Sequence, residues 1–229
     1  MKETLRQILE RWPRAYVELL RLKRRNHWSR GWVVSRDTEV VIEGYPRSGN
    51  SFAKSALVAV QPQRPNFATH LHSPAQIIQA AKWGIPTMVL LREPRGAVIG
   101  NLAFGCELYK KDPEAMPSSD FVRALARWVF FYQRILPWQG AFFVARFDRV
   151  IADFGQVTEA FNQQCGKNFV LFEHTPEKVD AIMGKSTHIG PQAYREKIKK
   201  VLQERYEAAT PAAMRKEADD LYRCLGNGG

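Results

Sequence analysis

The segment between residues 39 and 60 restricts the possible folds of this chain more than any other. Glu39–Gly44 is a short, largely β-branched run that ends in a glycine, and Tyr45–Asn50 follows it as a tight loop. The residues from Ser51 to about Val60 then have the pattern of a helix. A strand, a tight loop and a helix in this order are typical of the phosphate-binding corner of an α/β protein.

The rest of the chain continues this alternation of strands and helices. Thr87–Leu91 and Ala141–Ala145 are short apolar runs that predict two further strands, and each precedes a helical segment. A long helical pattern, Phe121–Leu136, lies between them. Strands that alternate with helices favour a parallel sheet covered on both faces. The expected fold is therefore a three-layer α/β/α structure with a central parallel sheet.

We interpret the chain as a single domain, because 229 residues support one sizeable core and no linker or internal repeat divides it. Residues 1–36 are expected to form a basic helical N-terminal segment, and residues 37–155 the nucleotide-binding core. Residues 156–229 form a helical C-terminal part, whose pattern predicts two helices, Tyr194–Ala209 and Pro211–Leu225.

Positive charge is concentrated near the N-terminus. The chain has 34 Lys and Arg residues against 23 Asp and Glu residues, a net charge of +11. Residues 1–36 hold ten of the basic residues and only three glutamates. Such an excess indicates an anionic partner. The N-terminal segment is either a solvated helix end or a contact surface for anionic lipid or an acidic acceptor.

The cysteines and the hydropathy pattern bear on the compartment. Cys106, Cys165 and Cys224 are far apart and form no CxxC pair, which fits a reducing environment. No apolar stretch is long enough to span a membrane, and the first residues lack the apolar core of a signal peptide. The sequence predicts a cytoplasmic protein, with peripheral membrane contact through residues 1–36 left open.

The loop departs from the NTPase pattern at one position. Gly44–Ser51 fits GxxxxGK[ST], except that Asn50 stands where the lysine should be. In NTPases that lysine reaches the β- and γ-phosphates, and an aspartate at the end of a strand helps to hold Mg²⁺; neither is found here. A nucleotide-dependent kinase is therefore the weaker alternative. What remains is a phosphate loop with a cation, Arg47, inside it, or a loop that only caps a structural helix.

Tyr45-Pro-Arg-Ser-Gly-Asn-Ser-Phe52 resembles the 5′-phosphosulfate loop of the sulfotransferases, commonly written YPKSGTTW. The resemblance implies a P-loop NTPase-like sulfotransferase fold, 3′-phosphoadenylyl sulfate (PAPS) as co-substrate, its bisphosphate (PAP) as product, and no metal. In the family the loop cation contacts the bridging oxygen of the leaving phosphate, which Arg47 can neutralise. Phe52 would present an aromatic face to the adenine, or else pack in the core. The implied nucleotide-binding residues are Pro46, Arg47, Ser48, Gly49, Asn50, Ser51 and Phe52.

A second segment, Leu91–Gly100, resembles the family's 3′-phosphate segment, a strand followed by RNPRDVAVS. Arg92 matches the arginine that grips the 3′-phosphate, for which a bidentate guanidinium is well suited. The family's serine falls on Gly100, which has no hydroxyl, and the adjacent Asn101 is the residue that can replace it. The alternative is that Arg92 only ends a strand in a surface ion pair.

The third match is Ala68-Thr-His-Leu-His72, which resembles the KTHLP element that carries the catalytic base of cytosolic sulfotransferases. His70 takes the base position, and His72 is the second candidate. On an extended stretch the two side chains would point to opposite sides. Only 23 residues separate Arg47 from His70, so we expect a short acceptor pocket. Together with the basic N-terminus, this favours a large or anionic acceptor, such as a glycan, or an acceptor presented at a membrane.

Two weaker matches complete the set. Val144–Asp153 resembles the family's RYEDLLADP segment and places Phe147 near the adenine, while Lys185 stands where the late RKGxxG loop closes over the 3′-phosphate. The sequence thus predicts an enzyme that transfers a sulfuryl group from PAPS to a hydroxyl or amine, with Arg47 and His70 as catalytic residues. The alternatives are the kinase, or a non-catalytic protein that binds anions or nucleic acid through residues 1–36; specific nucleic-acid recognition is not expected.

Overall fold

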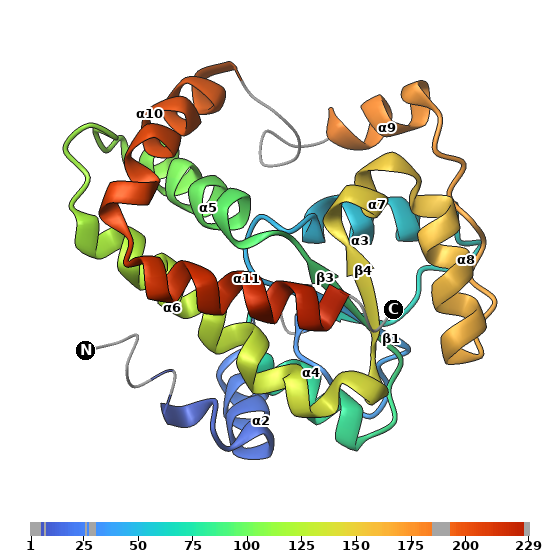
Figure 1. Cartoon of the computed structure of the whole chain (residues 1–229). Coiled ribbons are helices and arrows are strands. Elements are labelled where there is room, and N and C mark those ends of the chain that lie inside the picture. The colour runs from blue at the N-terminus through green and yellow to red at the C-terminus, as the bar shows by residue number, and fades with distance from the viewer. Residues whose placement is uncertain (1–5, 7, 26, 28–30, 185–192, 227–229) are drawn as a thin grey trace.

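The computed structural model describes residues 6, 8–25, 27, 31–184 and 193–226 (Figure 1). Its centre is a four-stranded sheet in the order β2-β1-β3-β4, and all neighbouring strands are parallel. The strands are β1 (Val40–Gly44), β2 (Phe67–Thr69), β3 (Thr87–Leu91) and β4 (Phe143–Arg146). The parallel sheet predicted from the sequence is confirmed, and β2 is a strand that the sequence pattern did not reveal.

Helices cover both faces of the sheet (Figure 1). In β3, Met88 and Leu90 join the apolar cluster on one face, whereas Val89 and Leu91 join the cluster on the other. This alternation places apolar side chains on both sides, as expected for a parallel strand buried between helices. One face is covered by α3 (Asn50–Val60), α7 (Phe147–Ala152), α8 (Phe154–Cys165) and α9 (Pro176–Met183).

The opposite face carries the longer helices. These are α4 (Pro74–Lys82), α5 (Pro94–Tyr109), α6 (Ser118–Ile135), α10 (Ala193–Ala209) and α11 (Ala212–Gly226), and a short 3₁₀ helix, η2 (Leu136–Ala141), follows α6. The predicted helices agree with α6, α8, α10 and α11 to within three residues at each end. Apolar side chains at helical spacing explain this agreement, because each of these helices buries one face.

A tyrosine of α6 ties this helix to the sheet below the phosphate loop. The buried Tyr132 hydroxyl donates to the carbonyl oxygen of Leu90 at 2.7 Å and accepts from the backbone N–H of Tyr45 at 3.3 Å. The Tyr45 hydroxyl in turn donates to the carbonyl oxygen of Ala124 at 3.0 Å. Since Tyr45 is the first residue after β1, these bonds fix the start of the loop against the core.

The N-terminal helix α2 (Pro13–Lys23) begins at a proline and packs on α4. Tyr16 and Val17 are buried in this contact, and Val17 belongs to a third apolar cluster with Val41 of β1 and Ala80 of α4. Among the described residues, no helix has the length and apolar character needed to cross a bilayer.

Candidate phosphate-binding site

Four candidate residues lie where the four strands end. Arg47 lies in the loop after β1, and His70, Arg92 and Phe147 each directly follow β2, β3 and β4. Because all four strands are parallel, their carboxyl ends share one edge of the sheet, which is where α/β proteins bind ligands. The topology therefore brings together segments that are up to 100 positions apart in the sequence.

The two glycines of the loop have different physical roles. A Cβ atom on Gly44 would collide with the carbonyl oxygen of Leu90, so the close approach of β3 requires glycine here. Gly49 has a φ of 95°, in the left-handed region, and is the N-cap of α3. No side chain caps this helix, and its first-turn N–H groups have no partner within the helix. Free amides at the start of a helix are a favourable position for an anion.

Arg47 and Arg92 are in direct contact. The Nη1 atom of Arg92 donates to the carbonyl oxygen of Arg47 at 2.9 Å, and Arg47 has a left-handed φ of 66°. Gly100 of α5 lies against both residues, and a Cβ atom there would be 3.3 Å from the Cβ of Arg47. A side chain at position 100 would therefore crowd the arginine pair. This is a steric reason for glycine at the position where the sulfotransferases have serine.

A third arginine, which the sequence analysis missed, completes a cationic cluster. Arg195 of α10 is only 1% exposed, and its Nε lies 2.6 Å from Oε2 of Glu107. The ring of Phe104 packs against two guanidinium groups, with its centroid 5.1 Å from Cζ of Arg47 and 5.6 Å from Cζ of Arg195. Two contacts of this kind hold the charged groups in place around one ring.

The environment of the cluster disfavours the charged forms of Arg47 and Arg92. Burial, together with the nearby Arg195 and Arg92 and against a smaller opposing effect of Glu107, lowers the pKa of Arg47 to about 10. Burial likewise lowers the pKa of Arg92. A bound anion would relieve this cost, as expected of a site that is preorganised for a negatively charged ligand.

Buried polar atoms without a hydrogen-bond partner among the described residues also lie beside the loop. Asn50 donates through Nδ2 to the carbonyl oxygen of Tyr45 at 3.1 Å, but its Oδ1 is buried and has no hydrogen-bond partner among the described residues. The Nε atom of Arg92 is in the same situation. Of these two atoms, only Arg92 Nε is a donor that could pair with a bound anion, because Asn50 Oδ1 is itself an acceptor.

His70 contacts the loop through its ring. Its Nε2 lies 3.0 Å from the hydroxyl oxygen of Ser51, and its Nδ1 lies 2.8 Å from that of Thr69. Burial lowers the pKa of His70 to about 3, and the neighbouring His72 and Lys54 add to the effect. The imidazole is therefore neutral at physiological pH and able to accept a proton.

The prediction that His70 and His72 lie on an extended stretch and point to opposite sides is wrong. His70 and His72 have left-handed φ values of 57° and 48°, so the backbone is not extended, and their ring centroids are 5.8 Å apart. His72 donates through Nδ1 to the carbonyl oxygen of Gly44 at 2.8 Å, which anchors it below the loop. Burial lowers its pKa to about 4, so it also is neutral. Left-handed non-glycine residues cluster at functional sites, where their strain is held by the surroundings.

Glu43, the next-to-last residue of β1, holds this strained turn and was also missed by the sequence analysis. Its fully buried carboxyl group accepts from the backbone N–H groups of Leu71 at 2.7 Å and His72 at 3.0 Å. From outside, Arg6 donates to the carbonyl oxygens of the same two residues at 2.7 and 2.9 Å. The turn is thus fixed on both its N–H and C=O sides.

The remaining predicted residues divide into three groups. Phe147 lies beside the cluster, because the Cζ of Arg92 is 4.3 Å from its ring centroid, and Asn101 donates to the Tyr45 hydroxyl at 3.3 Å. Phe52 is 4% exposed and makes edge contacts with Phe154, so it takes the core role rather than offering a free face to an adenine. Ser48 is buried in the loop and Pro46 half-buried, whereas Lys185 lies outside the described residues.

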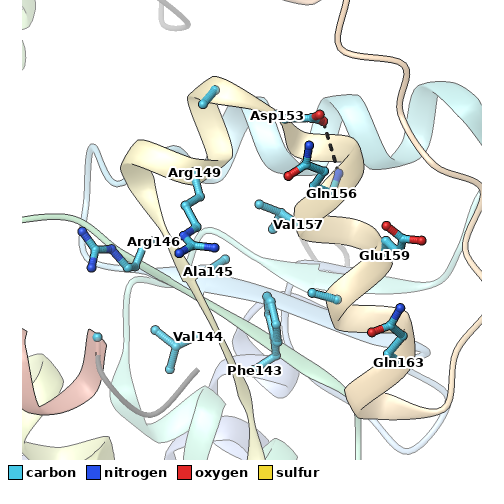
Figure 2. Close-up of a pocket in the computed structure, with 13 residues that line it drawn as sticks. Phe143, Val144, Ala145, Arg146, Arg149, Asp153, Gln156, Val157, Glu159 and Gln163 are labelled. Carbon is cyan, nitrogen blue, oxygen red and sulfur yellow. Dashed lines mark hydrogen bonds between the residues drawn. The ribbon is translucent and has the colours of Figure 1, made fainter.

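A separate cavity of about 600 Å³ lies beyond β4, between this edge strand and α8. Figure 2 shows Arg146 and Arg149 beside the cavity near α7, with Glu159 and Gln163 on α8. None of the residues predicted to bind the nucleotide lines it. The cavity is therefore distinct from the arginine cluster.

Comparison with known proteins adds no relative. No protein-family model matches the sequence. No curated protein matches it either.

Proposed function

We propose that this protein is a sulfotransferase that transfers a sulfuryl group from PAPS to a hydroxyl or amine, with a P-loop NTPase-like sulfotransferase fold. The observation that carries the proposal is the hydrogen bond of Arg92 to the carbonyl oxygen of Arg47, which joins the two arginines at the open N-terminus of α3. PAPS has phosphate groups on both sides of its ribose. Arg47 and the loop amides would take the 5′-phosphosulfate and Arg92 the 3′-phosphate.

The loop supports this proposal over a kinase. Asn50 occupies the position of the NTPase lysine, and its side chain turns inward to the carbonyl oxygen of Tyr45. The residues after β3 are Arg92 and Glu93, rather than the aspartate that holds Mg²⁺ in P-loop NTPases. Arg47, Arg92 and Arg195 instead supply a cationic site built from guanidinium groups, which suit phosphate recognition.

The proposed reaction is an in-line transfer. As the acceptor oxygen forms its bond to sulfur, the bond between sulfur and the bridging oxygen breaks, and that oxygen leaves with the electron pair. Arg47 and the loop amides lie where they can stabilise this negative charge, and they are held in place before the reaction begins. The acceptor proton would go to His70, whose imidazole is neutral.

Ser51 connects the base to the phosphate loop. Its hydroxyl lies 3.0 Å from Nε2 of His70 and belongs to the first turn of α3. An acceptor hydroxyl that replaced this contact would lie next to both the base and the phosphosulfate. The negative charge of the bound nucleotide would also raise the pKa of His70 from about 3 towards the range in which imidazole is an efficient base.

The acceptor is proposed only as a class. Arg47 and His70 are 23 residues apart, and α3 with a short connection to β2 fills that interval. This leaves little chain for a closed acceptor pocket. It favours a large or anionic acceptor, such as a glycan, or an acceptor presented at the cytoplasmic face of a membrane.

The test is transfer of radiolabelled sulfate from PAPS to a panel of glycans, lipids, phenols and peptides. Labelled product is expected with the wild-type protein and is expected to be lost in Arg47→Met. A parallel thermal-shift measurement compares PAP with Mg·ATP. PAP is expected to stabilise the protein. Stabilisation by Mg·ATP alone would refute the proposal in favour of a kinase.

A further inference from the structure

Exposed apolar side chains form a band along the N-terminal segment. The exposed fractions are 44% for Ile8, 60% for Trp12, 50% for Leu19 and 70% for Leu22. Ala15 is exposed as well. Steps of four and three residues place Ala15, Leu19 and Leu22 on one face of α2, whereas Ile8 and Trp12 precede this helix and Trp12 is its N-cap, with a non-helical backbone (φ −111°, ψ 78°). We refer to Ile8, Trp12, Ala15, Leu19 and Leu22 as the apolar stripe.

The apolar stripe lies opposite the face that attaches α2 to the protein. Pro13, Tyr16 and Val17 are buried, and α2 lies against α4 at the periphery of the molecule (Figure 1). The helix is therefore apolar on two sides, and only the inner side is needed for packing. A solvated helix with no further contact has no physical reason to expose large apolar residues in register.

Basic residues flank the apolar stripe. Residues 11–25 contain six Arg and Lys residues and one acidic residue, Glu18, which pairs with Arg21 at 3.5 Å. Glu10 is fully buried between Arg6 and Arg127 and contributes no outward negative charge. The exposed basic residues of this stretch are Arg11, Arg14, Lys23 and Arg25.

We propose that the segment from residue 8 to residue 25 docks the protein on anionic membrane surfaces. The apolar stripe would enter the boundary between head groups and acyl chains, and the flanking cations would contact the negative head groups. An apolar face bordered by Arg and Lys fits this interface, whereas an uncharged protein groove would leave the cations without partners.

The docking segment is joined to the candidate site by a direct contact. Arg6, two residues before the stripe begins, donates to the carbonyl oxygens of Leu71 and His72, which follow His70 in the strained turn. Docking would thus hold the proposed base beside the membrane surface. This last step rests on the proposed function, but the docking itself does not.

The experiment is co-sedimentation with vesicles of phosphatidylcholine alone and with 30 mol% phosphatidylserine, as a chosen composition, at low and physiological salt. Wild-type protein is expected to bind the anionic vesicles, with weaker binding at higher salt. Leu19→Ser/Leu22→Ser should bind about tenfold more weakly or worse, because two apolar side chains no longer insert. Leu171→Ser, at an exposed leucine outside the segment, is the matched control and should bind like the wild type.

A thermal shift with PAP accompanies each variant. A Tm without ligand equal to that of the wild type shows that Leu19→Ser/Leu22→Ser has an intact fold, and an unchanged shift with PAP separates docking from the proposed activity. Equal vesicle binding by this variant and the wild type would overturn the proposal. The proposal would also be overturned if the wild type did not bind anionic vesicles. It would be overturned as well if, in a parallel measurement, the protein showed salt-sensitive binding only to a single-stranded oligonucleotide.

Discussion

Replacing Arg47 with methionine should make the protein more stable while abolishing its proposed function. Arg47→Met removes the guanidinium but keeps an unbranched side chain, so the packing of its methylene groups next to Gly100 is retained. Methionine, like arginine, is not branched at Cβ, so the substitution adds no strain from β-branching to the left-handed backbone at this position. The variant therefore tests the charge rather than the shape of the site.

The magnitude follows from the lowered pKa. Burial and the neighbouring Arg195 and Arg92 lower the pKa of Arg47 to about 10. At about 1.4 kcal/mol per pH unit, the folded state carries a cost of about 3 kcal/mol for this charge. Partial solvent screening reduces this to about 1.5 kcal/mol. The lost contact with the Phe104 ring offsets about 0.5 kcal/mol, so Arg47→Met should be more stable by about 1 kcal/mol.

Differential scanning fluorimetry without ligand measures this effect. In a protein of this size, 1 kcal/mol corresponds to a rise in Tm of about 2–4 °C. PAP should raise the Tm of the wild type but not of Arg47→Met. Arg92→Met is the matched comparison, because it also removes a buried charge but loses the hydrogen bond to the Arg47 carbonyl oxygen, so it should be less stable than Arg47→Met by about 1 kcal/mol. A lower Tm for Arg47→Met, or an undiminished shift with PAP, would refute the reasoning.

Three further predictions follow from the structure. Burial raises the pKa of Glu43 to about 8, above its unfolded value, so its stabilising effect is complete below pH 4.5 and is lost as the pH rises through 8. Urea unfolding should show that the wild type loses about 1.4 kcal/mol per pH unit across this range relative to Glu43→Gln; parallel profiles would contradict this. Because the pKa of His70 is about 3, kcat/KM should stay level from pH 8 down to pH 5, and His70→Ala should lower kcat by about 100-fold or more. An acid limb near pH 6.5 would contradict the lowered pKa of His70, and an unchanged kcat in His70→Ala would exclude His70 as the base. Gly44→Ala should cost about 3 kcal/mol because its Cβ meets the Leu90 carbonyl oxygen, whereas Gly105→Ala in α5, where a Cβ has no close neighbour, should be neutral or stabilising; equal effects in urea unfolding would show that the strand contact is not tight.

The sequence allowed the layers of the fold to be predicted, because they depend on local patterns. The strand β3 is an almost continuous apolar run, β1 is apolar except for Glu43, and α6 and α8 have apolar residues at helical spacing. The strand β2 escaped prediction because its three residues, Phe67–Thr69, are too few for a pattern and are held by pairing with β1. Pairing is a long-range contact that a local pattern does not contain.

The candidate site could be predicted only in part for the same reason. Arg47 and Arg92 lie in motifs that directly follow strands, so their meeting at the sheet edge follows from the parallel topology. Arg195 lies about 100 residues further along, in a helix with a polar sequence. Its only local signal is its register with the buried Ile198 and Leu202 of α10, where an arginine is unexpected. Glu43 gave the related signal of a carboxylate inside an apolar strand.

The histidine turn shows a different limit. Sequence spacing suggested an extended stretch with rings on opposite sides, but His70 and His72 both adopt left-handed backbone conformations. Histidine adopts this conformation more often than most residues do, but it is still uncommon and no local sequence pattern marked it here. It is imposed by hydrogen bonds from Glu43 and Arg6, which come from other parts of the chain. Strain of this kind is visible only after the tertiary structure is known.

The most direct test of the account is a crystal structure of the protein with bound PAP. The 5′-phosphate should lie against Arg47 and the first N–H groups of α3, and the 3′-phosphate should contact the guanidinium of Arg92. A nucleotide bound elsewhere, such as in the cavity beyond β4, or no nucleotide at a saturating concentration of PAP, would contradict the central claim that the paired arginines form its binding site.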